Sequence, residues 1–302
     1  MEAEIIEPPV VLVAKHDGMQ HFCVDYRALN LVTKRDLYPL PWCDDILESL
    51  AGVQWFSHLD LLRGYWQIDV AVEDREKTAF ATPDGLYRFR RLNFGVTNAP
   101  TCFMRAMHLI LKGLCCSDCL VYLDDIIIFG RTLEEHRERL LLVLSRLAEA
   151  GLKINPKKCK LLSEQVVVLG HVVTREGIST DPEKVGFKME WPIPANATQL
   201  KVFLGTAGYY RQFTKLYPDC MPTVLCGTEG HNLTWTAECE EAFWMIKRHL
   251  SHAPILAFPR LDVPFILDTD ASDNGLGAVL SQIQDGQERI PNGICSACTI
   301  QS

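Results

Sequence analysis

Two adjacent aspartates, Asp124 and Asp125, stand between two runs of apolar residues in the segment CLVYLDDIIIFG (119–130). The β-branched and aromatic residues of both runs are typical of strands that are buried on both faces. The segment therefore predicts two strands joined by a tight turn that carries both acids. Carboxylates about 5 Å apart repel each other by roughly 3 kcal/mol at an effective dielectric of 20. Either water screens this repulsion in an exposed turn, or a divalent cation offsets it, because hard cations prefer oxygen ligands.

A third carboxylate, Asp60, lies in a predicted strand within the segment WFSHLDLLRGYWQIDV (55–70). Adjacent acids on a rigid turn, together with one acid from a neighbouring strand, meet the requirement of two-metal phosphoryl transfer. In that chemistry one cation activates the attacking hydroxyl and the other stabilises the leaving oxygen. The spacing is compatible with this chemistry, but it does not by itself distinguish such a site from an exposed acidic turn.

Two further hairpins are predicted on the N-terminal side of this turn. The first, over residues 9–26, turns at Asp17-Gly18, and the second, over residues 77–92, turns around Asp84-Gly85. Asp-Gly pairs favour tight turns, because glycine adopts a positive φ without steric cost.

Helical periodicity is clearest over residues 131–151, where Thr132 and Glu135 form a predicted capping box and Gly151 ends the helix. Asn98 is the predicted cap of a second amphipathic helix. Helices are expected over residues 40–52, 98–114, 197–213 and 236–250 as well. Two short strands, 263–272 and 275–283, precede a polar tail that begins at Asp285.

The composition is that of a globular protein, with 302 residues, 48% hydrophobic and 23% charged. No apolar run approaches the roughly 18 residues needed to span a bilayer, and the first residues lack a basic signal region. We therefore expect an intracellular protein, in the cytoplasm or nucleus, with no membrane partner. The net charge of −8 argues against indiscriminate coating of nucleic acid but leaves room for a local basic groove, as in GLKINPKKCK (151–160).

Several longer motifs occur in a recognisable order: VDYRALN, YPLP, LDLLRGYWQI, KTAFATPDGLYRFRRLNFGVTNAPTCF, VYLDDIIIF, HRERLLLVLSRLAEAGLKINPKKCKLL, LGHVVTREGISTDPEKV and FLGTAGYYRQF. FILDTDASDNGLGAVLSQ follows them. Together they resemble the reverse transcriptase of gypsy-type LTR retrotransposons, from about residue 5 to about residue 283. The last segment resembles the opening of that family's ribonuclease H domain.

The resemblance implies an α+β fold of the right-hand polymerase type, followed by an incomplete ribonuclease H-like α/β domain. Fingers and palm would occupy residues 1–174, the thumb and connection 175–234, and the truncated ribonuclease H-like domain 235–302. The implied activity is that of an RNA-directed DNA polymerase, which takes an RNA or DNA template with its primer, and dNTPs. The oligomeric state is not implied.

The family's catalytic acids correspond to Asp60, Asp124 and Asp125, of which the first two would bind two Mg²⁺ ions, or Mn²⁺, directly. The implied nucleotide-binding residues are Lys15, Leu61, Tyr65, Phe94 and Gly95. Tyr65 would exclude a 2′-hydroxyl from beneath the incoming sugar. Without the resemblance, Tyr65 would be interpreted as a core aromatic residue, and Lys15 as a solvated side chain. Residues 169–173 (LGHVV) resemble the strand region near the primer end.

Some positions depart from the family and favour an alternative. His21 stands where the family usually has arginine, Asn93 stands where it usually has proline, and the N-terminal stretch is short. The alternative is a remnant that folds and binds primer–template without polymerising; a purely structural role is a third reading. Asp270 matches the first ribonuclease H acid, but few residues follow it. We therefore expect no ribonuclease H activity, and Asp270-dependent cleavage of an RNA–DNA hybrid would contradict this expectation.

Overall fold

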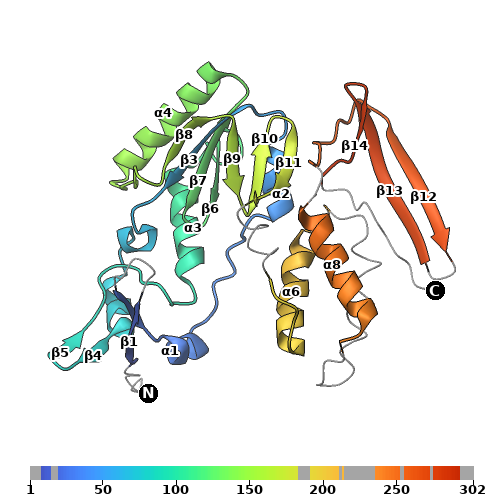
Figure 1. The fold of residues 1–302 in the computed structure, drawn as a ribbon. Helices are drawn as coiled ribbons and strands as arrows, with labels where there is room; N and C mark the ends of the chain where they lie inside the picture. The colour runs from blue at the N-terminus through green and yellow to red at the C-terminus, as the bar shows by residue number, and fades with distance from the viewer. Residues whose placement is uncertain are drawn as a thin grey trace. The chain divides into compact units, whose positions relative to one another are not determined.

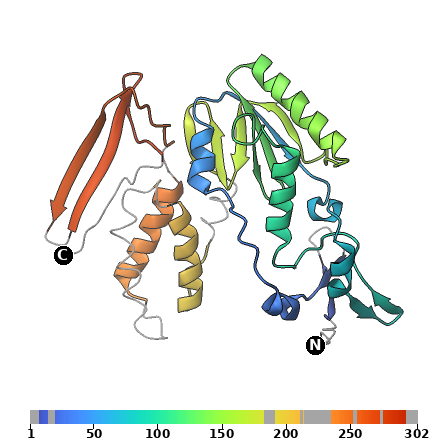
Figure 2. The same cartoon turned by 180° about the vertical axis from the view of Figure 1, so that it is seen from behind.

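The computed structural model describes residues 8–14, 20–182, 191–210, 213, 235–251, 255–272 and 275–292. The chain forms two compact units. Unit 1 comprises residues 1–42 and 55–163, and unit 2 comprises residues 43–54 and 164–302. Figures 1 and 2 show the elements of each unit from opposite sides.

The centre of unit 1 is a four-stranded sheet in the order β6-β7-β3-β8, with all neighbours antiparallel. Its strands are β3 (Trp55–Asp60), β6 (Cys119–Tyr122), β7 (Asp125–Gly130) and β8 (Lys160–Ser163). Tyr122 pairs with Asp125, so only Leu123 and Asp124 remain in the turn between β6 and β7. The predicted hairpin of buried strands is therefore confirmed.

Two helices, α3 (Ala99–Ile110) and α4 (Leu133–Glu149), contribute to one hydrophobic core with this sheet. Alternate residues of a strand point to opposite faces, and Leu59 of β3 and its partner Ile126 of β7 belong to this core. The next pair along the same strands is Asp60 and Asp125. These two acids therefore lie on the sheet face opposite to the one that packs in this core.

The capping box at the start of α4 is confirmed. The Glu135 backbone N–H donates to Thr132 Oγ1 over 3.2 Å, and Glu135 Oε2 accepts from the Arg131 backbone N–H over 2.7 Å. The start of α3 after Asn98 is also confirmed, but the side chain of Asn98 makes no capping hydrogen bond. Its side-chain amide instead donates to the Lys34 carbonyl and accepts from the Asp36 backbone N–H. These hydrogen bonds occupy the side-chain oxygen that would otherwise cap the helix.

Smaller elements complete unit 1. The hairpin of β1 (Val10–Ala14) and β2 (Gln20–Val24) is confirmed, although its turn lies outside the described residues. In the second hairpin, Pro83 and Asp84 form the turn, and Gly85 is already the first residue of the returning strand. The remaining elements are α1 (Arg27–Val32), which was not predicted, η1 (Gly64–Gln67), η2 (Val72–Thr78), β4 (Phe80–Thr82) and β5 (Gly85–Tyr87).

Unit 2 has two three-stranded antiparallel sheets, β11-β10-β9 and β12-β13-β14. Its helices are α2 (Cys43–Ser49), α6 (Ala197–Tyr209) and α8 (Ala237–Ser251). Its strands are β9 (Gln165–Val168), β10 (His171–Thr174), β11 (Gly177–Thr180), β12 (Phe265–Ser272), β13 (Gly275–Gln284) and β14 (Gln287–Arg289). The segment predicted as a polar tail from Asp285 onward contains a short strand that was not predicted, β14, whose backbone pairs with β13.

A buried histidine on α4 links the helix to the sheet of unit 1. His136 is fully buried, and its Nε2 lies 2.8 Å from Ser57 Oγ. Ser57 Oγ also accepts the Leu162 backbone N–H over 3.0 Å, and its own hydroxyl proton can be donated to Nε2 of a neutral ring. Burial first, and the Arg139 charge second, lower the pKa of His136. The folded chain therefore holds this imidazole neutral.

We expect the stability of the fold to decrease on acidification because of His136. Below the ordinary histidine pKa of about 6.5 the unfolded chain binds a proton that the folded chain resists, so unfolding is favoured as pH falls. Between pH 7.5 and 5.5 the wild type should lose about 1 kcal/mol more unfolding free energy than His136→Gln. Urea unfolding at both pH values measures the difference, and equal losses in the two proteins would contradict it.

Candidate active site

The three predicted acids meet at one end of the unit 1 sheet. Asp60 is the last residue of β3 and lies directly opposite Asp125, the first residue of β7. Asp124 occupies the turn immediately before β7. The pairing register of β3 with β7 therefore brings together residues that are far apart in the sequence.

The carboxylate of Asp124 is held in a confined environment. Its Oδ1 atom is buried and has no hydrogen-bond partner in the described structure. A Cβ placed on Gly64 would lie only 2.7 Å from this oxygen and 3.1 Å from the ring of Phe103. A side chain at position 64 would therefore force the Asp124 carboxylate to move, and would also press against the Phe103 ring. Leu123, the other residue of the turn, has a positive φ of 53°.

The environment of Asp124 disfavours its charge. Burial raises the pKa of Asp124, the negative charges of Asp125 and Asp60 raise it further, and only Lys158 acts in the opposite direction. The same charge contributes, after burial, to the raised pKa of the neighbouring Tyr65. The polypeptide alone thus leaves negative charge at this point without full compensation.

Two basic side chains contact the other two acids. His58 Nε2 lies 2.8 Å from Asp125 Oδ1, and Lys158 Nζ lies 3.4 Å from Asp60 Oδ2. Neither residue was singled out for these roles from the sequence. The signal for His58 was its position two residues before Asp60 in a strand, which places both side chains on one face.

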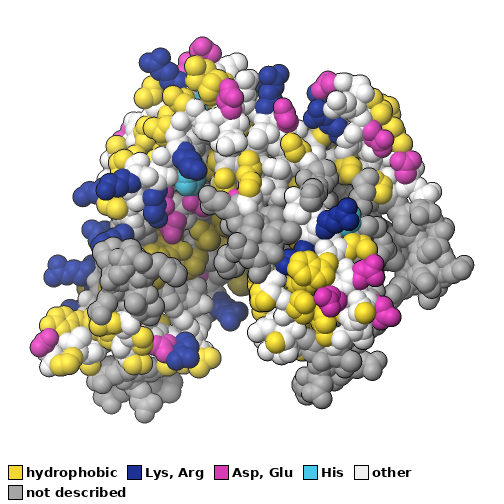
Figure 3. All heavy atoms as spheres, viewed as in Figure 1, with side chains coloured by type: hydrophobic (Ala, Val, Ile, Leu, Met, Phe, Trp, Pro, Cys, Tyr) yellow, Lys and Arg dark blue, Asp and Glu magenta, His cyan; other side chains and the backbone are white. Residues whose placement is uncertain are grey.

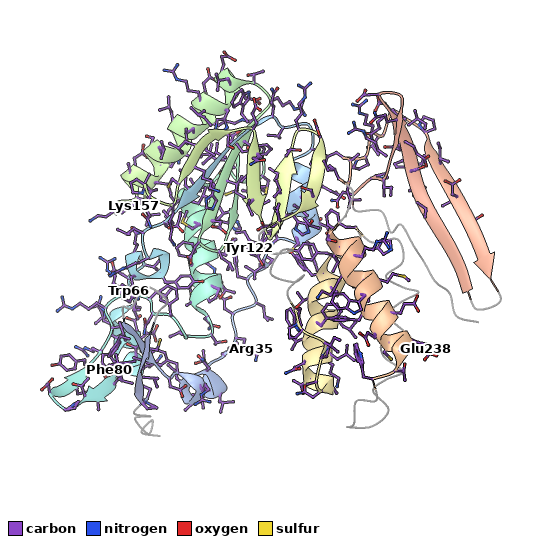
Figure 4. The ribbon with its side chains drawn as sticks, viewed as in Figure 1. Arg35, Trp66, Phe80, Tyr122, Lys157 and Glu238 are labelled. Carbon is purple, nitrogen blue, oxygen red and sulfur yellow. The ribbon has the colours of Figure 1, made fainter. Side chains whose placement is uncertain are left out.

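Lys158 reaches the site because its segment is bound to the end of β3. The Asn155 backbone N–H donates to the Asp60 carbonyl over 2.8 Å, and the Leu62 N–H donates to the Lys153 carbonyl over 2.9 Å. Lys153, Lys157 and Lys158 are all exposed. Lys and Arg side chains gather along the outer margin of unit 1 in Figure 3, and Lys157 and Trp66 are labelled on this side in Figure 4. A basic surface therefore adjoins the acidic site.

Among the expected nucleotide-binding residues, Tyr65 and Phe94 are in direct contact. The rings of Tyr65 and Phe94 lie 4.9 Å apart, and Tyr65 also packs on Phe103 at 5.4 Å. Leu61 is buried immediately after β3. Gly95 has a positive φ of 88°, and its carbonyl accepts from Asn30 Nδ2 over 2.7 Å.

Three further sequence positions lie wholly or partly outside the described residues, and a fourth, Asn93, lies within them. Lys15 lies outside the described residues. The backbones of His21 and Asp270 lie in β2 and β12, but their side chains are not described. Asn93, which departs from the family, is buried, and its Oδ1 accepts a hydrogen bond from Trp66 Nε1 over 3.3 Å. This substitution is therefore accommodated by a specific partner.

In unit 2, the turn between β9 and β10 is bound by two tyrosines at the end of α6. The Tyr209 hydroxyl donates to the Leu169 carbonyl over 2.6 Å, and the Tyr210 hydroxyl donates to the Gly170 carbonyl over 2.9 Å. Leu169 and Gly170 both have positive φ angles, 50° and 73°. The segment expected near the primer end is thus held in a defined turn by the neighbouring helix.

The site residues fit a divalent cation in part. Within the described ranges, no three His, Cys, Asp or Glu side chains form a group that could hold a metal ion. Asp125 is engaged by His58, whereas the buried oxygen of Asp124 has no donor. A cation held by Asp60 and Asp124 would offset the charge that the protein leaves uncompensated.

No helix in the described part of the chain is both long enough and apolar enough to cross a membrane.

Comparison with known proteins identifies two families in the chain. Residues 13–173 match "Reverse transcriptase (RNA-dependent DNA polymerase)", and residues 235–299 match "RNase H-like domain found in reverse transcriptase". The chain is 43% identical over 261 residues to the retrovirus-related Pol polyprotein from transposon 297 of Drosophila melanogaster, covering 86% of this chain and 25% of the relative. The polyprotein from transposon gypsy of the same organism is 37% identical over 272 residues, covering 86% and 26%. The chain thus spans about a quarter of the length of these relatives.

Solved structures show the same fold. A foamy viral protease-reverse transcriptase in complex with dsDNA is 25% identical with a TM-score of 0.85, over 100% of this chain and 62% of that chain. The same kind of protein in complex with an RNA/DNA hybrid is 24% identical with a TM-score of 0.80, over 100% and 40%. These findings confirm the resemblance to gypsy-type elements and the α+β right-hand polymerase fold with a ribonuclease H-like segment. The chain belongs to the reverse transcriptase family and is related to the Pol polyproteins of retrotransposons.

Proposed function

We propose that this chain is an RNA-directed DNA polymerase, which adds dNTPs to the 3′-hydroxyl of a primer on an RNA or DNA template. The observation that carries the proposal is the buried, unpartnered carboxylate oxygen of Asp124, beside Asp60 at the end of a rigid sheet. A protein gains no stability from such an arrangement, because a buried charge without a partner is costly. Such energetically unfavourable arrangements of charged groups are concentrated at functional sites.

Asp60 and Asp124 are the proposed ligands of two Mg²⁺ ions, or of Mn²⁺, with Asp125 as the third acid beside them. When bound, the cations would activate the primer hydroxyl and stabilise the leaving phosphate oxygen. The chain's own contribution is to fix Asp60 and Asp125 by β-pairing and to leave space for the Asp124 carboxylate at Gly64. Lys158 would provide a positive charge beside the triphosphate.

The proposed nucleotide pocket is formed by Leu61, Tyr65, Phe94 and Gly95, with Lys15 reaching the triphosphate. The ring of Tyr65 packs on Phe94, and burial first and the Asp124 charge second raise the pKa of Tyr65. The proposed domain boundaries are fingers and palm at 1–174, thumb and connection at 175–234, and the ribonuclease H-like segment at 235–302. The ranges of the two family matches support this division.

Primer–template is the proposed partner of the basic surface formed by Lys153, Lys157 and Lys158. We expect Lys157→Gln to weaken binding of an RNA–DNA duplex and to reduce the slope of log K against log salt by about 1, because each neutralised phosphate releases counterions. Arg137→Gln, on the exposed side of α4, is the matched control and should leave the slope unchanged. Fluorescence anisotropy at several salt concentrations measures both, and equal slopes for the two variants would contradict the assignment.

Primer extension tests the proposed function directly. Oligo(dT) annealed to poly(rA) is incubated with the folded chain, Mg²⁺ and dTTP. Extension of the primer is the expected result. A monodisperse wild type that binds the duplex in a salt-dependent manner but does not extend the primer would overturn the proposal in favour of a binding remnant. His21→Arg would then test whether that departure removed the activity.

A further inference from the structure

We propose that His58 is a positioning residue that keeps Asp125 out of the metal site, so that Asp60 and Asp124 alone bind the catalytic cations. The inference rests on the proposed polymerase function and concerns the same site. It starts from a hydrogen bond of 2.8 Å between His58 Nε2 and Asp125 Oδ1.

The register of the sheet creates this contact. His58 and Asp60 point to the same face of β3, because they are two residues apart in a strand. Asp125 lies directly opposite Asp60, and His58 lies opposite Ile127, so His58 and Asp125 are diagonal neighbours on this face. Diagonal pairs lie within reach of long side chains. The strand backbone thus fixes both ends of the hydrogen bond.

The two adjacent acids consequently have unequal environments. The carboxylate of Asp125 has a donor in His58, and half of its side chain is exposed. Oδ1 of Asp124 is buried without a donor. His58 itself is well covered, with a side-chain exposure of 20%, so it has little freedom to leave the contact.

This difference between the two acids affects metal binding, because three carboxylates without hydrogen-bond donors at one point would bind divalent cations tightly and without selectivity. Divalent cations bind more tightly as the number of charged oxygen ligands rises. The described residues contain no such three-ligand group, and Asp125 is hydrogen-bonded to His58. A cation would then be shared between Asp60 and Asp124, in the place where the incoming triphosphate supplies the remaining oxygens. Removing the His58 hydrogen bond would release Asp125 to bind the cation as well.

Mn²⁺ titration of the full chain, followed by electron paramagnetic resonance without nucleic acid, tests this role. We expect His58→Leu to bind Mn²⁺ about tenfold more tightly than the wild type, and to extend primers about tenfold more slowly at saturating Mn²⁺. His58→Asn, which is polar but too short to reach Asp125, should behave like His58→Leu. His58→Gln, whose amide can reach the same carboxylate oxygen, should behave like the wild type.

Two controls separate positioning from general damage. The double variant His58→Leu/Asp125→Asn should return to wild-type Mn²⁺ affinity, because the tightening depends on Asp125. His108→Leu also removes a histidine hydrogen bond, to the Tyr38 hydroxyl at 2.6 Å, but lies on α3, which packs in the core on the other sheet face. It should leave Mn²⁺ affinity unchanged.

Unchanged or weaker Mn²⁺ binding by both His58→Leu and His58→Asn would overturn the proposal. So would tightening that persists in the double variant. The binding titration needs no polymerase activity, so it judges the role of His58 even if the wild type fails to extend primers. A wild type without extension would instead count against the proposed function.

Discussion

Asp124→Asn is expected to abolish primer extension, by at least roughly 1000-fold, while raising the thermal midpoint of the metal-free chain by about 2–4 °C. The loss of activity is expected because the variant removes the charge of a proposed metal ligand. The gain in stability follows from removing a charge that burial and two neighbouring carboxylates disfavour, as the raised pKa of Asp124 shows. About 1 kcal/mol of stabilisation would produce a shift of this size.

Differential scanning fluorimetry without metal, paired with primer extension, measures both effects. Asp118→Asn is the matched control, because Asp118 forms a 3.0 Å ion pair with Arg139 in the same unit. Its loss should lower the midpoint and leave the rate of extension nearly unchanged. If Asp124→Asn destabilised the chain as much as Asp118→Asn, Asp124 would be a structural acid and not a functional one.

Tyr65→Ala is expected to reduce the preference for dNTPs over rNTPs by about 100-fold, mainly through faster incorporation of rNTPs. The ring of Tyr65 is buried and packs against the rings of Phe94 and Phe103, so its position is fixed. If Tyr65 has the proposed role, truncation to alanine opens the space that a 2′-hydroxyl would occupy. A steric barrier formed by the ring is removed when the ring is removed, but it remains when only the hydroxyl is removed.

Tyr65→Phe provides the control for this prediction. It retains the ring and its contacts with Phe94 and removes only the hydroxyl. Single-nucleotide incorporation of dTTP and UTP opposite the same template base gives the preference for each variant. If Tyr65→Phe lost as much discrimination as Tyr65→Ala, the hydroxyl would be responsible and the steric account would be wrong.

The local features of the site were predictable from the sequence. The acidic turn was predicted because β-branched residues flank Asp124 and Asp125, and the strand ending near Asp60 has the same character. The capping box of Thr132 and Glu135 was predicted because it depends on residues three apart in one helix. Each of these patterns is complete within a few residues, and therefore a single sequence contains it.

The partners of the acids were not predictable in the same way. His58 meets Asp125 only because β3 and β7 pair in one particular register, and Lys158 meets Asp60 only because its segment binds the end of β3. These contacts depend on residues that are distant in the sequence. At Asn98 a distant contact instead replaced a predicted local one, because its side chain hydrogen-bonds the loop at residues 34 and 36 and not the helix start. Tertiary contacts decided all three cases.

Gly64 illustrates a constraint that becomes interpretable only in the structure. Nothing in the segment LLRGYWQI distinguishes this glycine from one that ends a strand. In the fold, its missing side chain leaves the space that the Asp124 carboxylate occupies. The missing side chain of Gly64 thus leaves room for one of the acids of the site.

Asp60 and Asp124 are proposed to carry out nucleotide addition and not merely to hold the nucleic acid. Rapid-quench incorporation of a single dTTP on primed poly(rA) tests it, with the wild type beside Asp60→Asn and Asp124→Asn. Both variants are expected to bind primer–template with an affinity close to that of the wild type but to perform the chemical step at least roughly 1000-fold more slowly. Incorporation at the wild-type rate by either variant, or a defect confined to primer–template binding, would contradict it.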